Sequence, residues 1–152
     1  MSMIDIDFLI HSEVVVAATP AAIWPYIIET NRWHGSQTMI PAGGPPGEVG
    51  ERFHAVHSDF PDMVAFHIEN VELATHRRRT IRLDTPEGRY LGYATWVLGE
   101  GTTGTTVAYH VYCRYSAPVD AVRDGLLVQA QRQMDDGLER LKGLIEADAT
   151  AT

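Results

Sequence analysis

The clearest hydrophobic pattern is a stripe at helical spacing in the C-terminal part of the chain, between Pro118 and Ala147. Steps of four and three residues separate its members, and mostly polar residues lie between them. The stripe consists of Leu127, Gln131, Met134, Leu138, Leu141 and Ile145. One amphipathic helix after many strands is expected to lie across the face of a curved sheet. Polar Gln131 and pliable Met134 fit either a helix that closes a cavity or an imperfect core stripe, and the residues alone leave both open.

The preceding sequence predicts one strand, two short helical segments and then a series of strands. Thr19-Pro20 is typical of a helix start, with an N-cap residue and proline at the first helical position. The expected elements are a strand over 11–18, a helix over 21–29, a turn over 31–34 before Gly35, and a loop over 41–47. Strands follow over 51–58, 64–73, 78–84, 89–98 and 105–115, with a short one over 37–40, and turns lie at 59–62, 86–88 and 99–104. These tight connections predict an antiparallel meander.

Length and composition indicate one globular domain over residues 1–152, with loose termini at 1–9 and 148–152. The formal net charge of −8 disfavours nucleic acid and anionic membrane surfaces as partners. No apolar run approaches the ~20 residues of a membrane span, so membrane insertion is not expected. The single cysteine excludes an internal disulfide and, with an acidic N-terminus unlike a secretory signal, favours the cytoplasm. A monomer or weak homodimer is expected.

The basic residues bear on two possible activities, binding of an anionic partner and imine-forming catalysis. Arg77-Arg78-Arg79 with Arg82 could meet a phosphate or an acidic partner, but strand alternation would split the cluster, so a solvated strand edge is favoured. The only lysine, Lys142, lies beside the apolar stripe with no sign of the desolvation that Schiff-base chemistry requires. Imine-forming mechanisms are therefore disfavoured.

No metal or cofactor is expected. His54 and His57 lie three residues apart in a predicted strand, so they face opposite sides and cannot share one ion. One cysteine cannot form a thiolate cluster. The stretch from Gly43 to Gly47 contains two prolines and lacks the strand–loop–helix context of a phosphate loop.

The order of elements resembles the helix-grip fold of the SRPBCC superfamily, which includes START domains, birch-pollen-type allergens and polyketide cyclase/dehydrase-like proteins. The resemblance rests on the run from Val14 to Trp24, on Gly47–Phe53, on Val71-Glu72-Leu73 and on Gly104–Val107. It covers roughly His11 to Ala147 and points to the polyketide cyclase/dehydrase-like branch. It implies an α+β fold in which a curved antiparallel sheet of six or seven strands wraps around a long C-terminal helix, with two short helices after the first strand.

The same resemblance implies an apolar pocket between sheet and helix for lipids, polyketides or other aromatic molecules, without a universal catalytic set. Strand alternation predicts which residues face this pocket. The inward set is Tyr90, Gly92, Ala94, Trp96 and Leu98 opposite Val107, Tyr109, Val111, Cys113 and Tyr115, together with Phe53, Ala55, His57, Val64, Phe66, Ile81 and Leu83. A bulge between Phe66 and Val71 would turn Glu69 inward as well. Gly92 and Ala94, the smallest members, would leave room for a ligand.

These assignments give the predicted site. The ligand-binding residues are Trp33, Phe53, Phe66, Ile81, Leu83, Tyr90, Trp96, Val111, Tyr115, Gln131 and Met134, and the candidate acid–base residues are His57, Glu69 and Tyr109. The alternative interpretation makes His57 a core histidine and Glu69 a solvated residue at the pocket mouth. Trp24 is expected in the core, and Trp33 near the entrance.

Three functions are compatible with this sequence, and whether the protein is an enzyme stays open. The first is binding of a hydrophobic, aromatic or polyketide-like small molecule without a cofactor. The second is a cofactor-free cyclase, dehydratase or lyase that uses acid–base residues in the same pocket. The third is protein interaction through the sheet exterior or the arginine cluster. An absent pocket, together with an exposed apolar patch near Tyr93, His110 and Tyr112, would favour it.

Overall fold

The computed structural model describes residues 2–34 and 37–151, without the side chain of Pro61. Four residues lie outside the described ones: Met1, Gly35, Ser36 and Thr152. The glycine expected after the turn and the first and last residues of the expected loose termini are among them. The elements are β1 Met3–Val16, α1 Pro20–Ile28, the 3-10 turn η1 Thr30–Arg32, β2 Gln37–Gly43, β3 Arg52–His57, β4 Phe60–Ala74, β5 Arg78–Asp84, β6 Tyr90–Glu100, β7 Thr105–Pro118, α2 Val119–Arg123 and α3 Leu126–Thr150.

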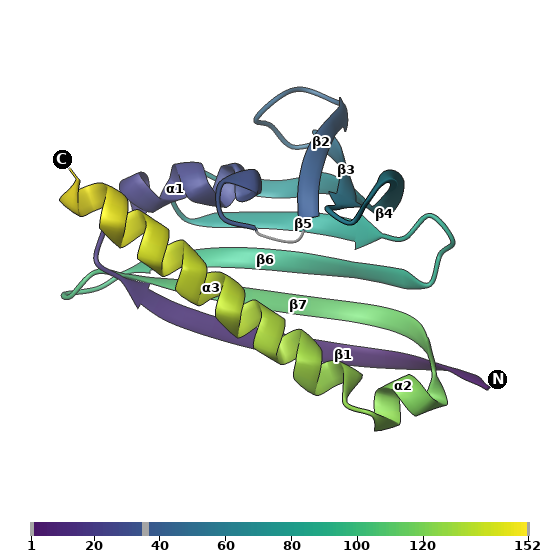
Figure 1. Ribbon diagram of the computed structural model, residues 1–152. Helices are drawn as coiled ribbons and strands as arrows, with labels where there is room; N and C mark the ends of the chain where they lie inside the picture. Colours follow the sequence, from purple (N-terminus) through teal and green to yellow (C-terminus); the bar gives the residue numbers. More distant parts are fainter. Residues whose placement is uncertain (1, 35–36, 152) are drawn as a thin grey trace.

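The strands form one seven-stranded antiparallel sheet in the order β1-β7-β6-β5-β4-β3-β2. Its curved face carries α3, which crosses in front of β1, β7 and β6, and the end of α3 lies beside α1 (Figure 1). Tyr26 of α1 donates a hydrogen bond from Oη to Asp148 Oδ2 near the end of α3. The predicted α+β helix-grip architecture is confirmed.

The first strand starts much earlier than the sequence interpretation assumed. β1 pairs with β7 without interruption from Met3 opposite Pro118 to Val16 opposite Thr105. Apolar residues alternate with others at Ile4, Ile6, Phe8 and Ile10, a period-2 signal that predicts a strand. The expectation of a loose segment over 1–9 is therefore wrong for the described residues, and α3 likewise continues through residues 148–150.

The C-terminal helix is broken near its start. Gly125 lies between α2 and α3 with φ 96°, a left-handed conformation that glycine adopts without steric cost. The expectation of one continuous helix over 118–147 is wrong at this point. The predicted stripe is confirmed, because its C-terminal residues Leu138, Leu141 and Ile145 are buried and its N-terminal residues are half-buried.

The predicted N-cap at Thr19 is confirmed, since its Oγ1 accepts a hydrogen bond from the Ala22 amide at 3.2 Å. Several other strand limits differ from expectation, among them two in the irregular part of the sheet, from β2 to β5. β2 continues to Gly43 and so includes part of the expected 41–47 loop, which an edge strand permits because Pro41 needs no ladder donor. β4 begins at Phe60, inside the expected 59–62 turn.

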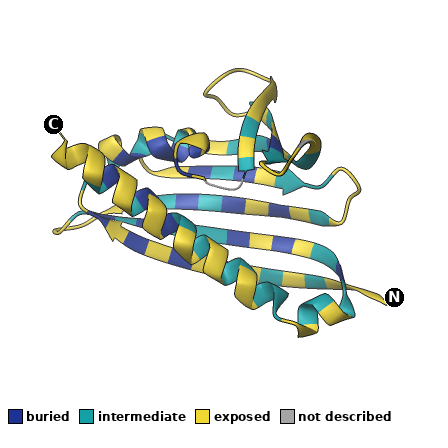
Figure 2. Ribbon diagram, viewed as in Figure 1, coloured by how far each residue is buried: buried dark blue, intermediate teal, exposed yellow. Residues whose placement is uncertain are grey.

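The alternation predicted for the last two hairpin strands is confirmed. Trp96 lies opposite Tyr109 and Ala94 opposite Val111, all on the inner side. Buried and exposed residues alternate along these strands (Figure 2). Gly92 leaves no free space, however, because a β-carbon there would lie 2.5 Å from Cys113 Cβ.

The arginine cluster is split between the two faces. Arg78 is exposed and forms an ion pair with Glu72 at 2.9 Å, as the solvated-edge interpretation predicts. Arg79 is fully buried on the inner face, at 0% exposure, so that interpretation is wrong for this residue. Alternation along β5 places Arg79 on the same side as Ile81.

Candidate ligand-binding cavity

A cavity of about 360 Å³ lies outside the sheet and a larger one of about 640 Å³ lies inside it. The larger, called the cavity below, occupies the space between the inner face and α3. Its lining is Phe8, Ile10, Trp33, His34, Tyr90, Tyr109, Val111, Ala130, Gln133, Met134, Asp136, Gly137, Leu138 and Arg140. Its size is within the range of small-molecule sites, roughly 300–1,000 Å³.

The floor of the cavity comes from the neighbouring strands β1 and β7, and Tyr90 is added by β6. Ile10 of β1 lies opposite Val111 of β7, and Phe8 lies opposite Cys113 in the same direction along the sheet. Tyr109 precedes Val111 by two residues in β7 and so lies on the same face. Because these pairs are in regular register, their side chains form a continuous apolar surface.

One wall is Trp33, which is held rigidly after η1. The ring is 5% exposed, and its Nε1 donates to the Tyr26 carbonyl oxygen at 2.9 Å. Gly137 of α3 faces this ring, and a β-carbon there would make an ordinary van der Waals contact, 3.6 Å from Trp33 Cζ3. Arg140 Nη1 donates to the Trp33 carbonyl oxygen at 3.3 Å. The sequence left Trp33 between core and entrance, and the structure places it in the cavity wall.

The two tyrosines of the cavity keep their protons at neutral pH. Burial raises the pKa of Tyr109 to about 12, although the positive charge of Arg79 acts in the opposite direction. Burial, followed by the neighbouring Cys113, raises the pKa of Tyr90 well above its ordinary value. Burial also raises the pKa of the Cys113 thiol to about 11. The cavity therefore offers neutral phenol donors and no thiolate nucleophile.

The mouth carries the charged residues of the lining. Its polar side chains are His34, Gln133, Asp136 and Arg140, three of them on α3. His34 is exposed by surface area, yet desolvation, followed by the charge of Arg140, lowers the pKa of its imidazole below 6.5. His34 is therefore largely neutral at pH 7 and can accept a proton there.

Five of the residues predicted from the sequence line the cavity: Trp33, Tyr90, Tyr109, Val111 and Met134. The others lie around it. Phe66 and Tyr115 contact Tyr90, with ring centroids 5.2 and 5.9 Å away. Ile81 and Trp96 are buried in the core, and Phe53 and Leu83 pack against it. Gln131 instead joins α3 to β1, donating from Nε2 to the His11 carbonyl oxygen at 2.7 Å.

Two predicted acid–base residues lie outside the cavity. The bulge in β4 falls between Asn70 and Glu72, later than Glu69, so Ile68 and Asn70 turn inward and Glu69 stays outside. The expectation that Glu69 faces the interior is therefore wrong. His57 lies at the other end of β3, where its side chain is 40% exposed and 3.8 Å from Asp59.

His57 and Glu69 are also far from each other. Glu69 lies opposite Arg52, and His57 is five residues along β3, which is roughly 17 Å in an extended strand. The pair proposed from the sequence does not form. Register shifts on both sides of Val56 explain why alternation failed at His57.

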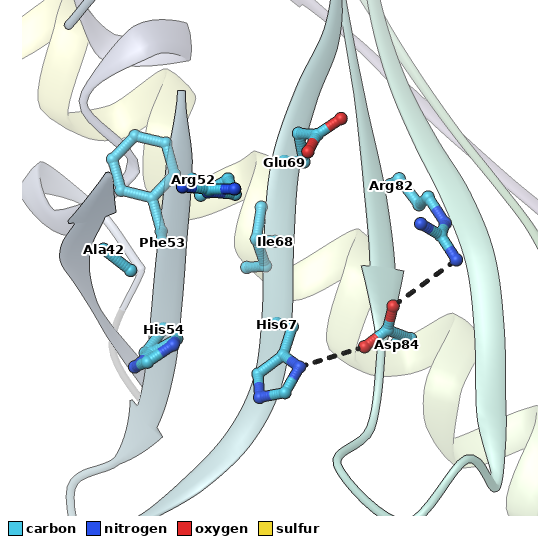
Figure 3. Close-up of a pocket in the computed structure, with 9 residues that line it drawn as sticks. All are labelled: Ala42, Arg52, Phe53, His54, His67, Ile68, Glu69, Arg82 and Asp84. Carbon is cyan, nitrogen blue, oxygen red and sulfur yellow. Dashed lines mark ion pairs between the residues drawn. The ribbon is translucent and has the colours of Figure 1, made fainter. Parts of the chain in front are cut away.

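Glu69 belongs to a second hollow on the outer face of β3, β4 and β5, called the outer-face hollow below. Its lining is Ala42, Arg52, Phe53, His54, His67, Ile68, Glu69, Arg82 and Asp84. Figure 3 shows the charged side chains of the three strands in rows, with His67 and Arg82 directed at Asp84, at 3.3 and 3.6 Å. Opposite charges alternate here, so the hollow has no dominant sign of charge.

Sequence reasoning missed several lining residues, and two patterns could have revealed them. The alternation in residues 4–10 identifies Phe8 and Ile10 as inward residues of a strand. On α3, Gln133, Gly137 and Arg140 recur at helical spacing beside the apolar stripe, which makes the covered face wider than the stripe. No signal in the sequence identified His34.

Within residues 2–34 and 37–151, no group of three or more His, Cys, Asp or Glu side chains is arranged to hold a metal ion. In the same part of the chain, no helix is both long and apolar enough to cross a membrane.

Residues 8–146 match the model of a family described as polyketide cyclase / dehydrase and lipid transport. The chain belongs to this family. The match runs from Phe8 within β1 to Glu146 within α3 and so includes every residue that lines the cavity. No curated protein matches the sequence.

Solved structures show the same fold at low sequence identity. An uncharacterised protein from Rhizobium leguminosarum is 13% identical, with a TM-score of 0.69 over 97% of this chain and 99% of its own. DynU16, a protein in the dynemicin biosynthetic locus, is 19% identical, with a TM-score of 0.65 over 91% of this chain and 47% of its own. Norcoclaurine synthase from Thalictrum flavum, solved as a point mutant with a transition-state analogue, is 12% identical, with a TM-score of 0.62 over 95% and 98%.

Proposed function

We propose that this protein binds a hydrophobic small molecule, aromatic, polyketide-like or lipid-like, in the cavity between the sheet and α3. The observation that carries the proposal is the 640 Å³ cavity itself, whose walls are mostly apolar and aromatic and whose charged residues are on α3 and at the mouth. Sites for small apolar ligands have this makeup, with a few polar groups that orient the ligand.

The affinity of such a site comes from apolar surface removed from water. Each Å² contributes roughly 25 cal/mol, against which the lost freedom of the ligand must be set. The rings of Trp33, Tyr90 and Tyr109 offer flat surfaces for an aromatic ligand. Trp33 is already fixed by its hydrogen bond to Tyr26, so little side-chain ordering is needed there.

The relatives support this class of function. The family description names polyketide cyclases, dehydrases and lipid transport, all of which handle hydrophobic small molecules. One structural neighbour comes from a biosynthetic locus, and another is a synthase solved with a transition-state analogue. As part of the same proposal, the protein acts in the cytoplasm as a monomer or weak homodimer, and nucleic acid is not its partner.

A neutral fluorescent probe tests the proposal. N-phenyl-1-naphthylamine brightens in an apolar site and should bind the wild-type protein with saturation at about one equivalent. Ala130→Trp, which adds an indole to the cavity wall on α3, should weaken binding at least tenfold. Val128→Trp on the exposed side of the same helix is the matched control and should bind like wild type. Equal binding by both variants, or no saturable binding by the wild type, would contradict the proposal.

A cofactor-free cyclase, dehydratase or lyase is the second candidate. It is favoured by one observation: a phenol that holds its proton, Tyr109, and an imidazole that is neutral at pH 7, His34, line the same cavity. Such a pair could give a proton to a ligand carbonyl and take one from a ligand carbon. Tyr109 thus stays a candidate from the sequence, with His34 in place of His57 and Glu69.

The interaction role has weaker support. Leu9, Tyr93 and Tyr112 are exposed next to one another on the outer face. This patch together with an absent pocket would favour the interaction role, but the cavity is present. Binding of a small molecule is therefore the function that this structure favours.

A further inference from the structure

The inner face of the sheet carries a buried positive charge, that of Arg79. Arg79, Trp96 and Tyr109 are neighbours across β5, β6 and β7, in one row of paired residues. The Trp96 and Tyr109 rings are stacked, with centroids 4.7 Å apart and planes 7° from parallel. The Arg79 guanidinium, from the strand on the other side of β6, lies over the Trp96 ring, 5.6 Å from its centroid. The row ends at Tyr109, which lines the cavity.

Arg79 has an incomplete set of partners. Its Nε donates to Asn70 Oδ1 at 3.0 Å, and its Nη1 donates to the carbonyl oxygens of Ile27 and Ile28 at 2.5 and 3.3 Å. These carbonyl groups end α1, where a cation is favoured by the helix dipole. Nη2, however, is buried and has no hydrogen-bond partner in the described part of the chain, and the same is true of Trp96 Nε1.

The charge of Arg79 is only partly balanced, by the carboxylate of Glu51, whose negative charge opposes the effect of burial on the pKa of Arg79. Within residues 2–34 and 37–151, no carboxylate forms an ion pair with it. Burial lowers the pKa of Arg79 to about 10, so the guanidinium is still protonated at pH 7. A buried cation without a carboxylate in direct contact is costly unless neighbouring groups or a ligand balance its charge. Its field reaches the cavity, because the Arg79 charge opposes the rise in the pKa of Tyr109.

We propose that the ligand carries an anionic oxygen, of which a carboxylate is the simplest form, and that this group binds beside Tyr109, where Arg79 stabilises it from behind Trp96. This inference rests on the proposed binding function and adds the chemical class of the ligand. The Tyr109 phenol donates a hydrogen bond to the oxygen, while the partly balanced charge of Arg79 favours an acid over a neutral compound of the same shape. The overall charge of −8 would by itself have the opposite effect.

The size of the preference follows from the distances. Two successive contacts of 5.6 and 4.7 Å separate the guanidinium from the Tyr109 ring. Over roughly 10 Å and an effective dielectric constant of about 20, one pair of charges gives about a tenfold preference. Solvent screens this interaction little, because Arg79 is fully buried.

The test compares 2-naphthoate with its neutral counterpart 2-naphthamide, by isothermal titration calorimetry at pH 7. The wild type should bind naphthoate about tenfold more tightly. Arg79→Met removes the charge and retains much of the apolar stem, and the two affinities should become nearly equal. Arg78→Met is the matched control, since it removes the same charge from the exposed side of the same strand, and it should keep the tenfold preference.

Two further variants keep the test decisive. Tyr109→Phe retains the stack on Trp96 and should reduce the preference about threefold or more; if Arg79→Met does not fold, an unchanged preference in Tyr109→Phe overturns the proposal. Arg140→Met removes the cation at the mouth, and loss of the preference in this variant together with an unchanged preference in Arg79→Met would place the acid at the mouth and overturn the proposal.

The outcomes separate the inference from the function on which it rests. Equal binding of acid and amide by the wild type, or an unchanged preference in folded Arg79→Met, overturns the anionic ligand and leaves binding of a hydrophobic molecule in place. Failure of both probes, together with failure of the neutral naphthylamine probe, overturns the binding function itself.

Discussion

The two halves of the sheet differ in regularity, and this difference decides where the site lies. From β6 through β7 to β1, residues pair without a register shift from one end to the other. From β2 to β5 the register shifts in all of the strand pairs, namely β2–β3, β3–β4 and β4–β5. The β5–β6 pair, which joins the two halves, has no shift. The regular half supplies the strand residues of the cavity, and the irregular half supplies the outer-face hollow.

The comparison teaches that alternation is reliable only between bulges. A bulge moves each residue beyond it to the other face, so an error of one position in its placement reverses an assignment. Tyr109 and Glu69 illustrate the two cases. Both were candidate acid–base residues, but only Tyr109 belongs to a strand without a shift, and only Tyr109 lines the cavity.

The largest expected effect is on the rate of a reaction catalysed through Tyr109, in the regular half of the sheet. If the protein catalyses ring closure, heptane-2,4,6-trione, which loses one water on closing to a pyrone, should react faster in its presence. Tyr109→Phe should reduce this acceleration about 100-fold, because a positioned proton donor contributes roughly 10²–10⁴-fold. Glu69→Gln in the outer-face hollow is the control and should have no effect. The measurement is pyrone absorbance over time, and a larger loss in Glu69→Gln would reverse the comparison.

A smaller effect concerns the tight packing of β6 against β7. Gly92→Ala would bring a β-carbon to 2.6 Å from the Tyr112 carbonyl oxygen and still closer to Cys113. We expect a loss of about 1–3 kcal/mol in the free energy of unfolding, as for other overpacked sites.

Gly99→Ala is the matched control on the same strand, since a β-carbon there meets nothing within 4 Å. Urea denaturation of both variants measures the difference. Equal stability of the two would show that the β6–β7 pair can relax, and that its regularity does not reflect tight packing.

The smallest effect concerns pH. Desolvation lowers the pKa of His34 below its unfolded value of about 6.5, so the unfolded state binds more protons in this range. The free energy of unfolding should therefore fall as the pH decreases from 7 through 6.5 towards the folded pKa. His34→Gln should reduce this slope.

His110 on the outer face provides the comparison for this pH effect. Desolvation, followed by the charge of His11, also lowers the pKa of His110, so His110→Gln should reduce the same slope. Binding of the neutral probe separates the two residues. His34→Gln at the mouth should change its affinity, whereas His110→Gln should not. Urea denaturation at pH 5.5 and 7.5 and probe titration measure both effects, and a wild-type slope of opposite sign would contradict this account.

The sequence by itself determined the family, the order of elements and the inner face of β6 and β7. These depend on local signals, namely the Thr19-Pro20 helix start, the period of 2 in the last hairpin and the helical stripe ending in Ile145. The early start of β1 is also encoded locally, in the alternation of Ile4, Ile6, Phe8 and Ile10. Each of these signals acts over a few residues, so it can be read along the chain.

Only the tertiary structure decided which polar groups meet the cavity. The position of the β4 bulge depends on pairing with β5, and it placed Glu69 outside and Asn70 inside. Burial of Arg79 depends on the end of α1, which supplies carbonyl acceptors from residues about fifty positions away in the chain. His34 reached the mouth because α3 folds back over the sheet and brings Arg140 beside it. These are contacts between distant segments, and no local pattern encodes them.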